Sequence, residues 1–206
     1  MNPKMQKSIA TYNATASKLA LTYNSLNSTD VHPYLEDILP SSTAAAPLNA
    51  LDLGCGSGRD AFWLASKGYK VVAIDAAVNM IAEAQAHKSH PDILYLVDTM
   101  PDIPVVRTLE RKFDAILLSA VWMHLDTDER RNLVKTLSEI STEQSIIYIT
   151  LRHGTSPEDR PMLPVSMDEV HRLATEFGFT WDEIAPVEDH LNRQDVHWEY
   201  AALRHA

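Results

Sequence analysis

The feature that most constrains the fold is a run of three glycines at alternate positions in residues 54–58, directly after the short apolar segment 50–53. An amphipathic segment, 60–67, follows, and a second apolar run, 69–74, then ends at Asp75. This order predicts a strand, a tight glycine turn, a helix and a second strand that ends in an acid. Such a βαβ unit opens a site for a nucleotide-type cofactor, because glycine lets the backbone approach a ligand closely.

The spacing of the glycines separates two kinds of cofactor site. A dinucleotide fingerprint, G-x-G-x-x-G, that began at Gly54 would need glycine at position 59, where this chain has Arg59. The third glycine comes one residue early, at Gly58, and the phosphate-loop pattern G-x-x-x-x-G-K-[ST] is absent. Asp75 follows Gly54 by 21 residues (75 − 54), and an acid there accepts hydrogen bonds from ribose hydroxyls. The spacing therefore argues against a nicotinamide-dependent oxidoreductase.

At these residues the chain resembles the class I S-adenosylmethionine-dependent methyltransferases, whose turn Asp-x-Gly-x-Gly-x-Gly is matched by residues 52–58. The resemblance extends from Tyr12 to Arg204. It implies that the turn holds the methionine end of S-adenosyl-L-methionine and that Asp75 holds the ribose. No pyrophosphate needs a helix N-terminus in such a site, which agrees with the missing glycine. Family members with Gly-Arg-Asp after the turn act on chalcogen compounds such as tellurite, but the likeness to them is confined to the turn.

Strand and helix patterns alternate along the chain, which predicts an α/β fold: a Rossmann-like, doubly wound, mostly parallel sheet with an antiparallel terminal strand pair. The resemblance implies seven strands. We expect residues 1–48 to form an N-terminal helical cap and linker, and residues 49–206 to form the Rossmann-like methyltransferase domain, in one compact domain overall. The expected strands are 49–53, 70–75, 93–97, 113–119, 145–151, 180–187 and 196–204, and the expected helices are 5–26, 31–39, 60–67, 78–87, 126–140 and 167–177.

Two expectations concern local structure within the predicted helices. In helix 126–140 an apolar stripe predicts one buried face, and the charged residues 128–131 are expected to be solvated. Before helix 167–177, Ser166 and Glu169 have the spacing of a capping box.

The composition limits the compartment and the partners. The 206 residues carry a formal net charge of −10, which argues against broad binding to nucleic-acid backbones. Cys55 is the only cysteine, so no internal disulfide can form. The N-terminus lacks the apolar stretch of a signal peptide, and no apolar run approaches the about 18 residues of a membrane span. We expect a cytoplasmic protein without a metal site, since no histidine pair has ligand spacing. The oligomeric state stays open.

Ligands of open α/β sheets bind beyond the carboxyl ends of the strands. Asp52, Asp75, Asp98 and Ser119 come at the ends of successive predicted strands, and carboxylates that face one crevice need a cationic or donor-rich ligand between them. The resemblance implies that Asp98, with Thr99 beside it, accepts a hydrogen bond from the adenine amino group. The predicted cofactor-binding residues are Tyr23, Asp52, Gly54, Cys55, Gly56, Gly58, Arg59, Asp75, Ala76, Met80, Asp98, Thr99 and Ser119.

Several of these residues have a second interpretation. Met80 can pack on the adenine or ribose, or it can belong to the core. Arg59 can reach the cofactor carboxylate, or it can pair with Asp60 or Asp75. Asp98 can cap a turn or helix instead of binding adenine.

Methyl transfer from a sulfonium is an in-line displacement, so the protein mainly orients the reactants and excludes water. A general base helps when the acceptor is a hydroxyl or an ammonium group. His124 follows the fourth strand, where substrate meets cofactor in the family, and it is the candidate base; a structural role is the alternative. The candidate substrate-binding residues are Tyr12, Trp122, Arg152, His153, Arg160 and Arg193.

Three arginines in the late loops, Arg152, Arg160 and Arg193, suggest a small anionic acceptor, although each can instead pair with a neighbouring acid. The motif Asn/Asp-Pro-Pro-Tyr/Phe is missing after the fourth strand, which disfavours adenine or glutamine-amide acceptors. We therefore expect a small-molecule methyltransferase. A protein or RNA methyltransferase and a non-catalytic S-adenosylmethionine-binding regulatory protein are the alternatives. The acceptor atom stays open.

Overall fold

The structure is a computed structural model that describes residues 1–187, 189–191 and 193–206. Its core is one sheet of seven strands: β1 (Asn49–Leu53), β2 (Lys70–Asp75), β3 (Ile93–Val97), β4 (Phe113–Leu118), β5 (Ser141–His153), β6 (Phe179–Ile184) and β7 (His197–His205). The helical elements are α1 (Pro3–Asn24), α2 (Ser28–Val31), α3 (Leu35–Ile38), α4 (Arg59–Ser66), α5 (Val78–His87), α6 (Pro104–Arg107), the 3₁₀ turn η1 (Trp122–His124), α7 (Thr127–Ile140) and α8 (Met167–Glu176).

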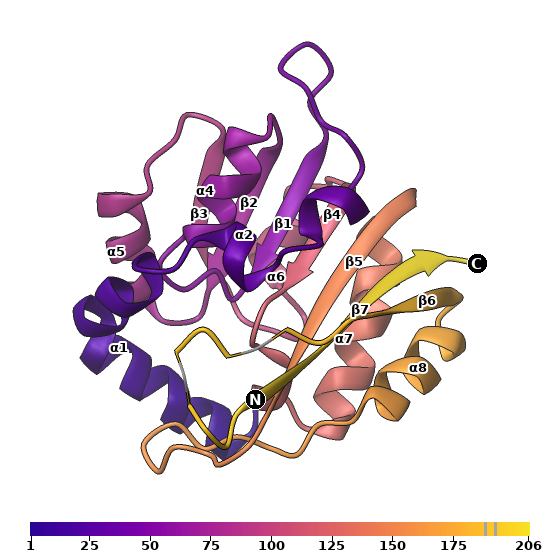
Figure 1. The fold of residues 1–206 in the computed structure, drawn as a ribbon. Coiled ribbons are helices and arrows are strands. Elements are labelled where there is room, and N and C mark those ends of the chain that lie inside the picture. Colours follow the sequence, from indigo (N-terminus) through magenta and orange to yellow (C-terminus); the bar gives the residue numbers. More distant parts are fainter. Residues whose placement is uncertain (188, 192) are drawn as a thin grey trace.

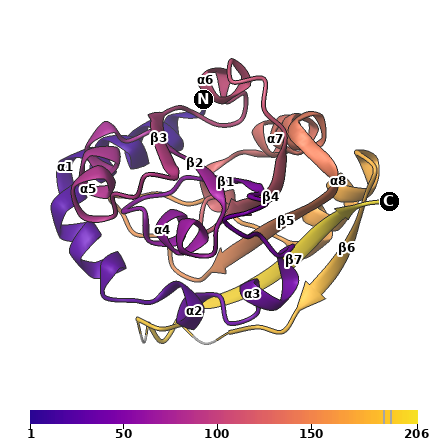
Figure 2. The same cartoon turned by 90° about the horizontal axis from the view of Figure 1, so that it is seen from above.

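The strand order is β3-β2-β1-β4-β5-β7-β6, and the chain reverses its crossover direction beside β1 (Figure 1). β7 runs antiparallel to both β5 and β6, whereas the other neighbours are parallel. α4 and α5 cover one face of the sheet, and α7 and α8 cover the other (Figure 2). The doubly wound sheet with its antiparallel terminal strands is confirmed. No helix in the described ranges is long and apolar enough to cross a membrane.

The strands are apolar on both sides because each side of the sheet meets its own hydrophobic core. Along β2, Val72 and Ile74 face the core shared with α7 and α8, while Val71 and Ala73 face the core shared with α4 and α5. Successive side chains of a strand point to opposite faces, so burial of both faces requires an unbroken apolar run. These strands could therefore be predicted from unbroken apolar runs in the sequence, without an alternation of polar and apolar residues.

α1 crosses the carboxyl edge of the parallel strands and is fixed on both sides of it (Figure 1). At its start, Asn2 caps the helix and donates its side-chain amide to the carbonyl oxygen of His124 (3.1 Å) and to Glu129. Further along, the side chain of Asn13 accepts a hydrogen bond from the backbone N–H of Asn79 in α5 (3.0 Å). α1 therefore forms a roof over the region where the strands end.

Two of the charged residues expected on the solvated face of α7 are buried instead. Glu129 is 7% exposed and Arg130 is 4% exposed. The guanidinium of Arg130 donates to Glu169 (2.7 Å) and to the carbonyl oxygens of Trp122 (3.2 Å) and Pro164 (2.9 Å). The expectation is wrong at Arg130 because α8 and the segment before it cover this side chain. It is wrong at Glu129 because Met1 and Asn2 lie on the carboxylate.

Other differences are local. The helix expected over 31–39 is two short helices, since Pro33 disfavours the α conformation at His32, where φ is −131°. β5 begins before position 145 because a register shift opposite β4 lets it pair from Ser141. Ser166 precedes α8 but makes no side-chain capping bond, whereas α7 has a complete capping box. α6 and η1 were not expected.

Arg130 provides a test of this packing. Arg130→Met is expected to lower the free energy of unfolding by about 3–5 kcal/mol, because it leaves the Glu169 carboxylate and two carbonyl oxygens without their donor. Arg131→Met is the matched control, since Arg131 is exposed on the same helix and its loss should change stability by about 0.5 kcal/mol or less. Denaturant unfolding measures both variants, and equal midpoints would contradict the role given to Arg130.

Candidate functional site

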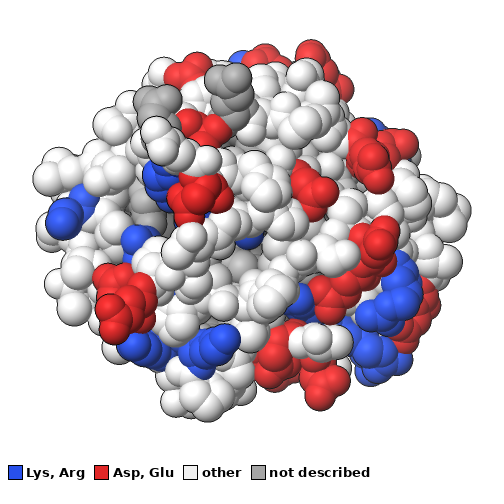
Figure 3. Space-filling view, turned by 60° about the horizontal axis from the view of Figure 1, so that its bottom comes forward, with Lys and Arg blue, Asp and Glu red and all other residues white. Residues whose placement is uncertain are grey.

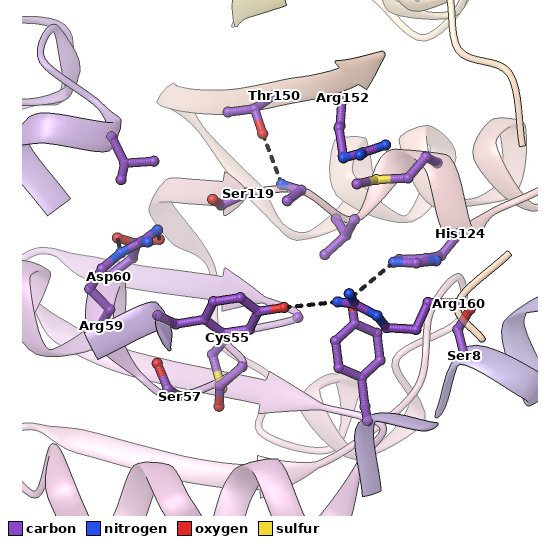
Figure 4. Close-up of a pocket in the computed structure, with 18 of the residues that line it drawn as sticks. Ser8, Cys55, Ser57, Arg59, Asp60, Ser119, His124, Thr150, Arg152 and Arg160 are labelled. Atoms are coloured by element: carbon purple, nitrogen blue, oxygen red, sulfur yellow. Dashed lines mark hydrogen bonds and ion pairs between the residues drawn. The ribbon is translucent and has the colours of Figure 1, made fainter. Parts of the chain in front are cut away.

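A cavity lies at the carboxyl ends of β1, β2, β4 and β5, under α1 and the loop 154–165. In Figure 4, Arg59 and Asp60 lie at one end of it, and His124 and Arg152 lie at the other. The cavity thus has two chemically different ends. The sequence-predicted site residues that line it are Tyr12, Tyr23, Gly54, Cys55, Gly56, Arg59, Asp75, Ala76, Ser119, His124, Arg152, Arg160 and Arg193.

The glycine turn forms one wall, and its backbone conformation requires glycine. Gly54 has φ +74°, and a Cβ there would lie 2.3 Å from Cγ1 of Val121. Gly56 has φ +53°, and its N–H donates to Oδ2 of Asp75 (3.0 Å). The other carboxylate oxygen accepts from the N–H of Ala77 (2.8 Å). Burial raises the pKa of Asp75, although these amide donors oppose the shift. The turn therefore bends around a fixed, half-buried carboxylate that lines the cavity.

Three residues predicted to contact the cofactor support the turn from behind and do not line the cavity. A Cβ at Gly58 would lie 2.6 Å from the hydroxyl of Tyr95, so this glycine serves the packing against β3. Met80 is fully buried, and its Cε lies 3.7 Å from the position of a Cβ on Gly56. Asp52 is buried beside α4, because the alternation of β1 turns it away from the cavity.

Asp98 and Thr99 do not line the cavity either. The Asp98 carboxylate accepts hydrogen bonds from the N–H groups of Thr99 (2.8 Å) and Val106 (2.8 Å), so it caps the first turn of α6. The expectation that three carboxylates face one crevice is therefore wrong in this structure. Asp75 is the only one of the three that lines it.

At the glycine end, Arg59 is paired with its neighbour. Its Nε and Nη2 donate to the two oxygens of Asp60 (2.8 and 2.7 Å). Nε2 of His32 lies 3.4 Å from Oδ2 of Asp60 and 3.1 Å from the hydroxyl of Ser119. Burial alone would raise the pKa of Asp60, but Arg59 and His32 outweigh it and hold the pKa well below its usual range. The ion pair leaves Arg59 on the cavity wall beside the glycine turn.

At the opposite end, His124 is 8% exposed and lies among cations. Its Nε2 is 3.4 Å from the hydroxyl of Tyr12, and the two rings meet edge to face. The guanidinium of Arg160 lies 5.6 Å above the Tyr12 ring and donates to the hydroxyl of Tyr23 (3.3 Å). Burial, followed by the charges of Arg160 and Arg152, lowers the pKa of His124 from 6.5 to about 4. His124 is therefore a neutral imidazole near pH 7.

Two predicted substrate residues do not reach the cavity. Trp122 begins η1 and is fully buried in the core, so it is not the substrate-binding side chain that was predicted. Nε2 of His153 lies 2.6 Å from Oε2 of Glu199, and its ring stacks on His197. It lies on the opposite face of β5 from Arg152, since adjacent residues of a strand point in opposite directions.

The sequence analysis missed several lining residues. His32 stood in a segment interpreted only as a short helix, and Thr150 and Tyr200 stood in strands interpreted as core. Thr150 precedes Arg152 by two residues and pairs with Tyr200, so strand periodicity could have placed all three on one face. The remaining lining residues that were not predicted include Met5, Ser8, Asp60, Met100, Val121, Met123, Met162, Asp189 and Trp198. No group of side chains suited to a metal ion occurs within the described ranges.

The neutral state of His124 predicts acid sensitivity. In the unfolded chain His124 takes up a proton at a pKa of 6.5, whereas in the folded protein it stays neutral down to about 4. Stability is therefore retained above pH 6.5 and declines as the pH falls from 6.5 to 4, by about 3 kcal/mol at most. His124→Asn should lack this part of the decline, and His87→Asn, at an exposed histidine, should keep it. Parallel pH profiles of unfolding for wild type and His124→Asn would contradict the assignment.

Residues 50–143 match a family model described as a methyltransferase domain. The chain is 26% identical over 156 residues to the probable S-adenosyl-L-methionine-dependent methyltransferase TehB of Haemophilus influenzae, covering 76% of this chain and 52% of TehB. It is 22% identical over 146 residues to the 2-heptyl-1-hydroxyquinolin-4(1H)-one methyltransferase of Mycobacteroides abscessus, covering 70% of this chain and 64% of that protein. The chain thus spans about half the length of TehB and under two thirds of the second relative.

Solved structures share the fold. A TehB-like S-adenosylmethionine-dependent methyltransferase from Corynebacterium glutamicum has a TM-score of 0.67 at 18% identity, covering 94% of this chain and 99% of that chain. The family model covers the segment that contains the glycine turn and Asp75. Taken with the strand order and the geometry of the turn, these matches show that the chain is similar to S-adenosylmethionine-dependent methyltransferases in the segment 50–143 and in its fold.

Proposed function

We propose that this protein binds S-adenosyl-L-methionine in the cavity and transfers its methyl group to a small, anionic acceptor. The observation that carries the proposal is that one cavity joins the glycine turn and Asp75 at one end to a neutral imidazole among arginines at the other. The first end suits a cofactor with a ribose and an amino-acid tail. The second end suits the proton transfer and the recognition of an acceptor.

The residues at the glycine end fit the cofactor. Gly56 lines the cavity without a Cβ, beside the ring of Tyr23, which leaves room for the methionine tail. The half-buried Asp75 carboxylate is the acceptor for the ribose hydroxyls, and Arg59 is the donor for the cofactor carboxylate. Cys55, Ala76 and Ser119 complete the cofactor wall. When bound, the cofactor supplies a methyl group already activated by a sulfonium.

The chain's own part in the reaction is orientation, exclusion of water and proton transfer. His124, held neutral, accepts the proton of a hydroxyl or ammonium nucleophile, and Tyr12 fixes the imidazole by its hydroxyl. We propose that residues 1–48 act as a cap on the domain 49–206. The hydroxyls of Ser8 and Thr11 donate to carbonyl oxygens in the loop 154–165, at 3.4 and 2.6 Å, which closes the roof over the reactants.

Charge supports a small acceptor rather than a nucleic acid. The net charge is −10, and in Figure 3 acidic side chains lie among the basic ones on the described part of that face, without a continuous basic surface. The relative from Mycobacteroides abscessus is named for a small aromatic compound, which supports the same class of acceptor here.

Calorimetry with S-adenosyl-L-methionine, S-adenosylhomocysteine and NAD, followed by transfer of a labelled methyl group to a metabolite extract, tests the function. Binding of the first two ligands and label in a small molecule would support it. Binding of NAD alone would overturn it. Binding of the methyl donor without transfer would favour a regulatory protein. Label in protein or RNA would show that the acceptor is a macromolecule and not a small molecule.

Asp75→Asn is expected to weaken S-adenosyl-L-methionine binding about tenfold to a hundredfold, because an amide replaces one charged acceptor oxygen with a donor. The control is Asp182→Asn, which removes an exposed carboxylate on β6 and should leave the dissociation constant unchanged. Calorimetry measures both variants. Equal dissociation constants for Asp75→Asn and wild type would remove Asp75 from the cofactor site.

A further inference from the structure

Arg152 is a buried cation whose hydrogen bonds are incomplete. It lies near the end of β5, lines the cavity and is 7% exposed. Its Nη2 donates to the carbonyl oxygen of Thr155 (3.2 Å), and its Nη1 points at the sulfur of Met162 (3.2 Å). Its Nε is buried and has no hydrogen-bond partner among residues 1–187, 189–191 and 193–206. A thioether is a weak acceptor, so two of the three guanidinium nitrogens lack a strong one.

No carboxylate of residues 1–187, 189–191 or 193–206 lies within 4.0 Å of this guanidinium. The neighbouring acids have other partners: Asp189 pairs with Arg193, and Asp195 accepts from the N–H of Thr155 (3.0 Å). Burial and then the charge of Arg193 lower the pKa of Arg152, while the charges of Asp195 and Asp189 oppose the shift. Leaving a buried charge without a counter-ion costs several kcal/mol, so an anionic ligand would relieve a real penalty.

The other two arginines of the site are already engaged. Arg193 gives Nε and Nη2 to Asp189, and Arg160 is held by the hydroxyl of Tyr23 and the ring of Tyr12. Within the described residues, the edge of Arg152 formed by Nη1 and the second N–H of Nη2 therefore has no strong acceptor. A guanidinium edge binds the two oxygens of a carboxylate through parallel N–H bonds, whereas a phosphate dianion is best matched by more than one cation.

We propose that Arg152 anchors a carboxylate group of the methyl acceptor, with the carboxylate oxygens replacing the thioether of Met162. This inference rests on the proposed function and names its substrate class. The charge of Arg152 helps to lower the pKa of His124, and both residues lie at the same end of the cavity (Figure 4). A carboxylate bound to Arg152 therefore leaves the rest of the acceptor between the imidazole and the glycine end.

The test uses the protein saturated with S-adenosylhomocysteine and titrated with benzoate, with the neutral benzamide and with inorganic phosphate. Wild type is expected to bind benzoate. Arg152→Met should weaken benzoate at least about tenfold and leave benzamide and S-adenosylhomocysteine unchanged. Arg152→Lys keeps the charge but loses the planar guanidinium, so its affinity for benzoate should lie between those of wild type and Arg152→Met. Arg131→Met is the matched surface control and should bind benzoate as wild type does.

Arg152→Met has a second readout. Because it removes a buried charge that has no carboxylate of residues 1–187, 189–191 or 193–206 within 4.0 Å, the variant should melt at or above the temperature of the ligand-free wild type, and benzoate should raise the melting temperature of wild type alone. If wild type does not bind S-adenosylhomocysteine, the result would count against the proposed function. If S-adenosylhomocysteine binds, three results would overturn the carboxylate anchor: wild type fails to bind benzoate, Arg152→Met binds benzoate with the same affinity as wild type, or phosphate binds in place of benzoate.

Discussion

The close passage of the backbone between β1 and α4 is the constraint on which the rest of the structure depends. At Gly54 the chain runs against Val121, and at Gly58 it runs against Tyr95, at distances that no Cβ could tolerate. These two contacts fix the turn against both β4 and β3. Because the turn cannot move outward, the carboxyl edge of the sheet keeps an open space, and the side chains that end the neighbouring strands meet there.

The cavity that results is electrostatically uneven. At the glycine end, Arg59 balances Asp60, His32 adds a further contact, and backbone N–H groups bind the carboxylate of Asp75. At the other end, Arg152 and Arg160 surround an imidazole that burial keeps uncharged. This separation places proton acceptance and anion recognition away from the carboxylate that serves the cofactor. The two halves of a transfer reaction can thus be tuned independently.

Much of the architecture could be predicted from the sequence because its signals are local. The bounds of β2, β3 and α5 agree with those expected, since unbroken apolar runs and helical periodicity were enough to define them. The glycine spacing and Asp75 likewise specified one wall of the site. What was missed depends on contacts between distant parts of the chain.

Three residues illustrate this limit. Glu129 looks like a surface charge until Asn2, 127 positions earlier, comes to lie on it. Asp98 ends its strand as a cofactor acid would, but the unexpected α6 uses its carboxylate. Trp122 follows β4 at a position where a side chain could have faced substrate, yet η1 turns it into the core. In each case the local pattern was compatible with two environments, and tertiary packing chose between them.

The roof over the cavity also has a mechanical consequence. Hydrogen bonds attach α1 to α7 at its first turn and to α5 at its middle, so the helix is fixed at two points across the opening of the cavity. The hydroxyls of Ser8 and Thr11 donate hydrogen bonds from α1 to the loop 154–165. The N–H of Leu163 in this loop donates to η1. Arg160 of the same loop adds contacts with Tyr12 and Tyr23 of α1, so helix and loop together cover this side of the cavity.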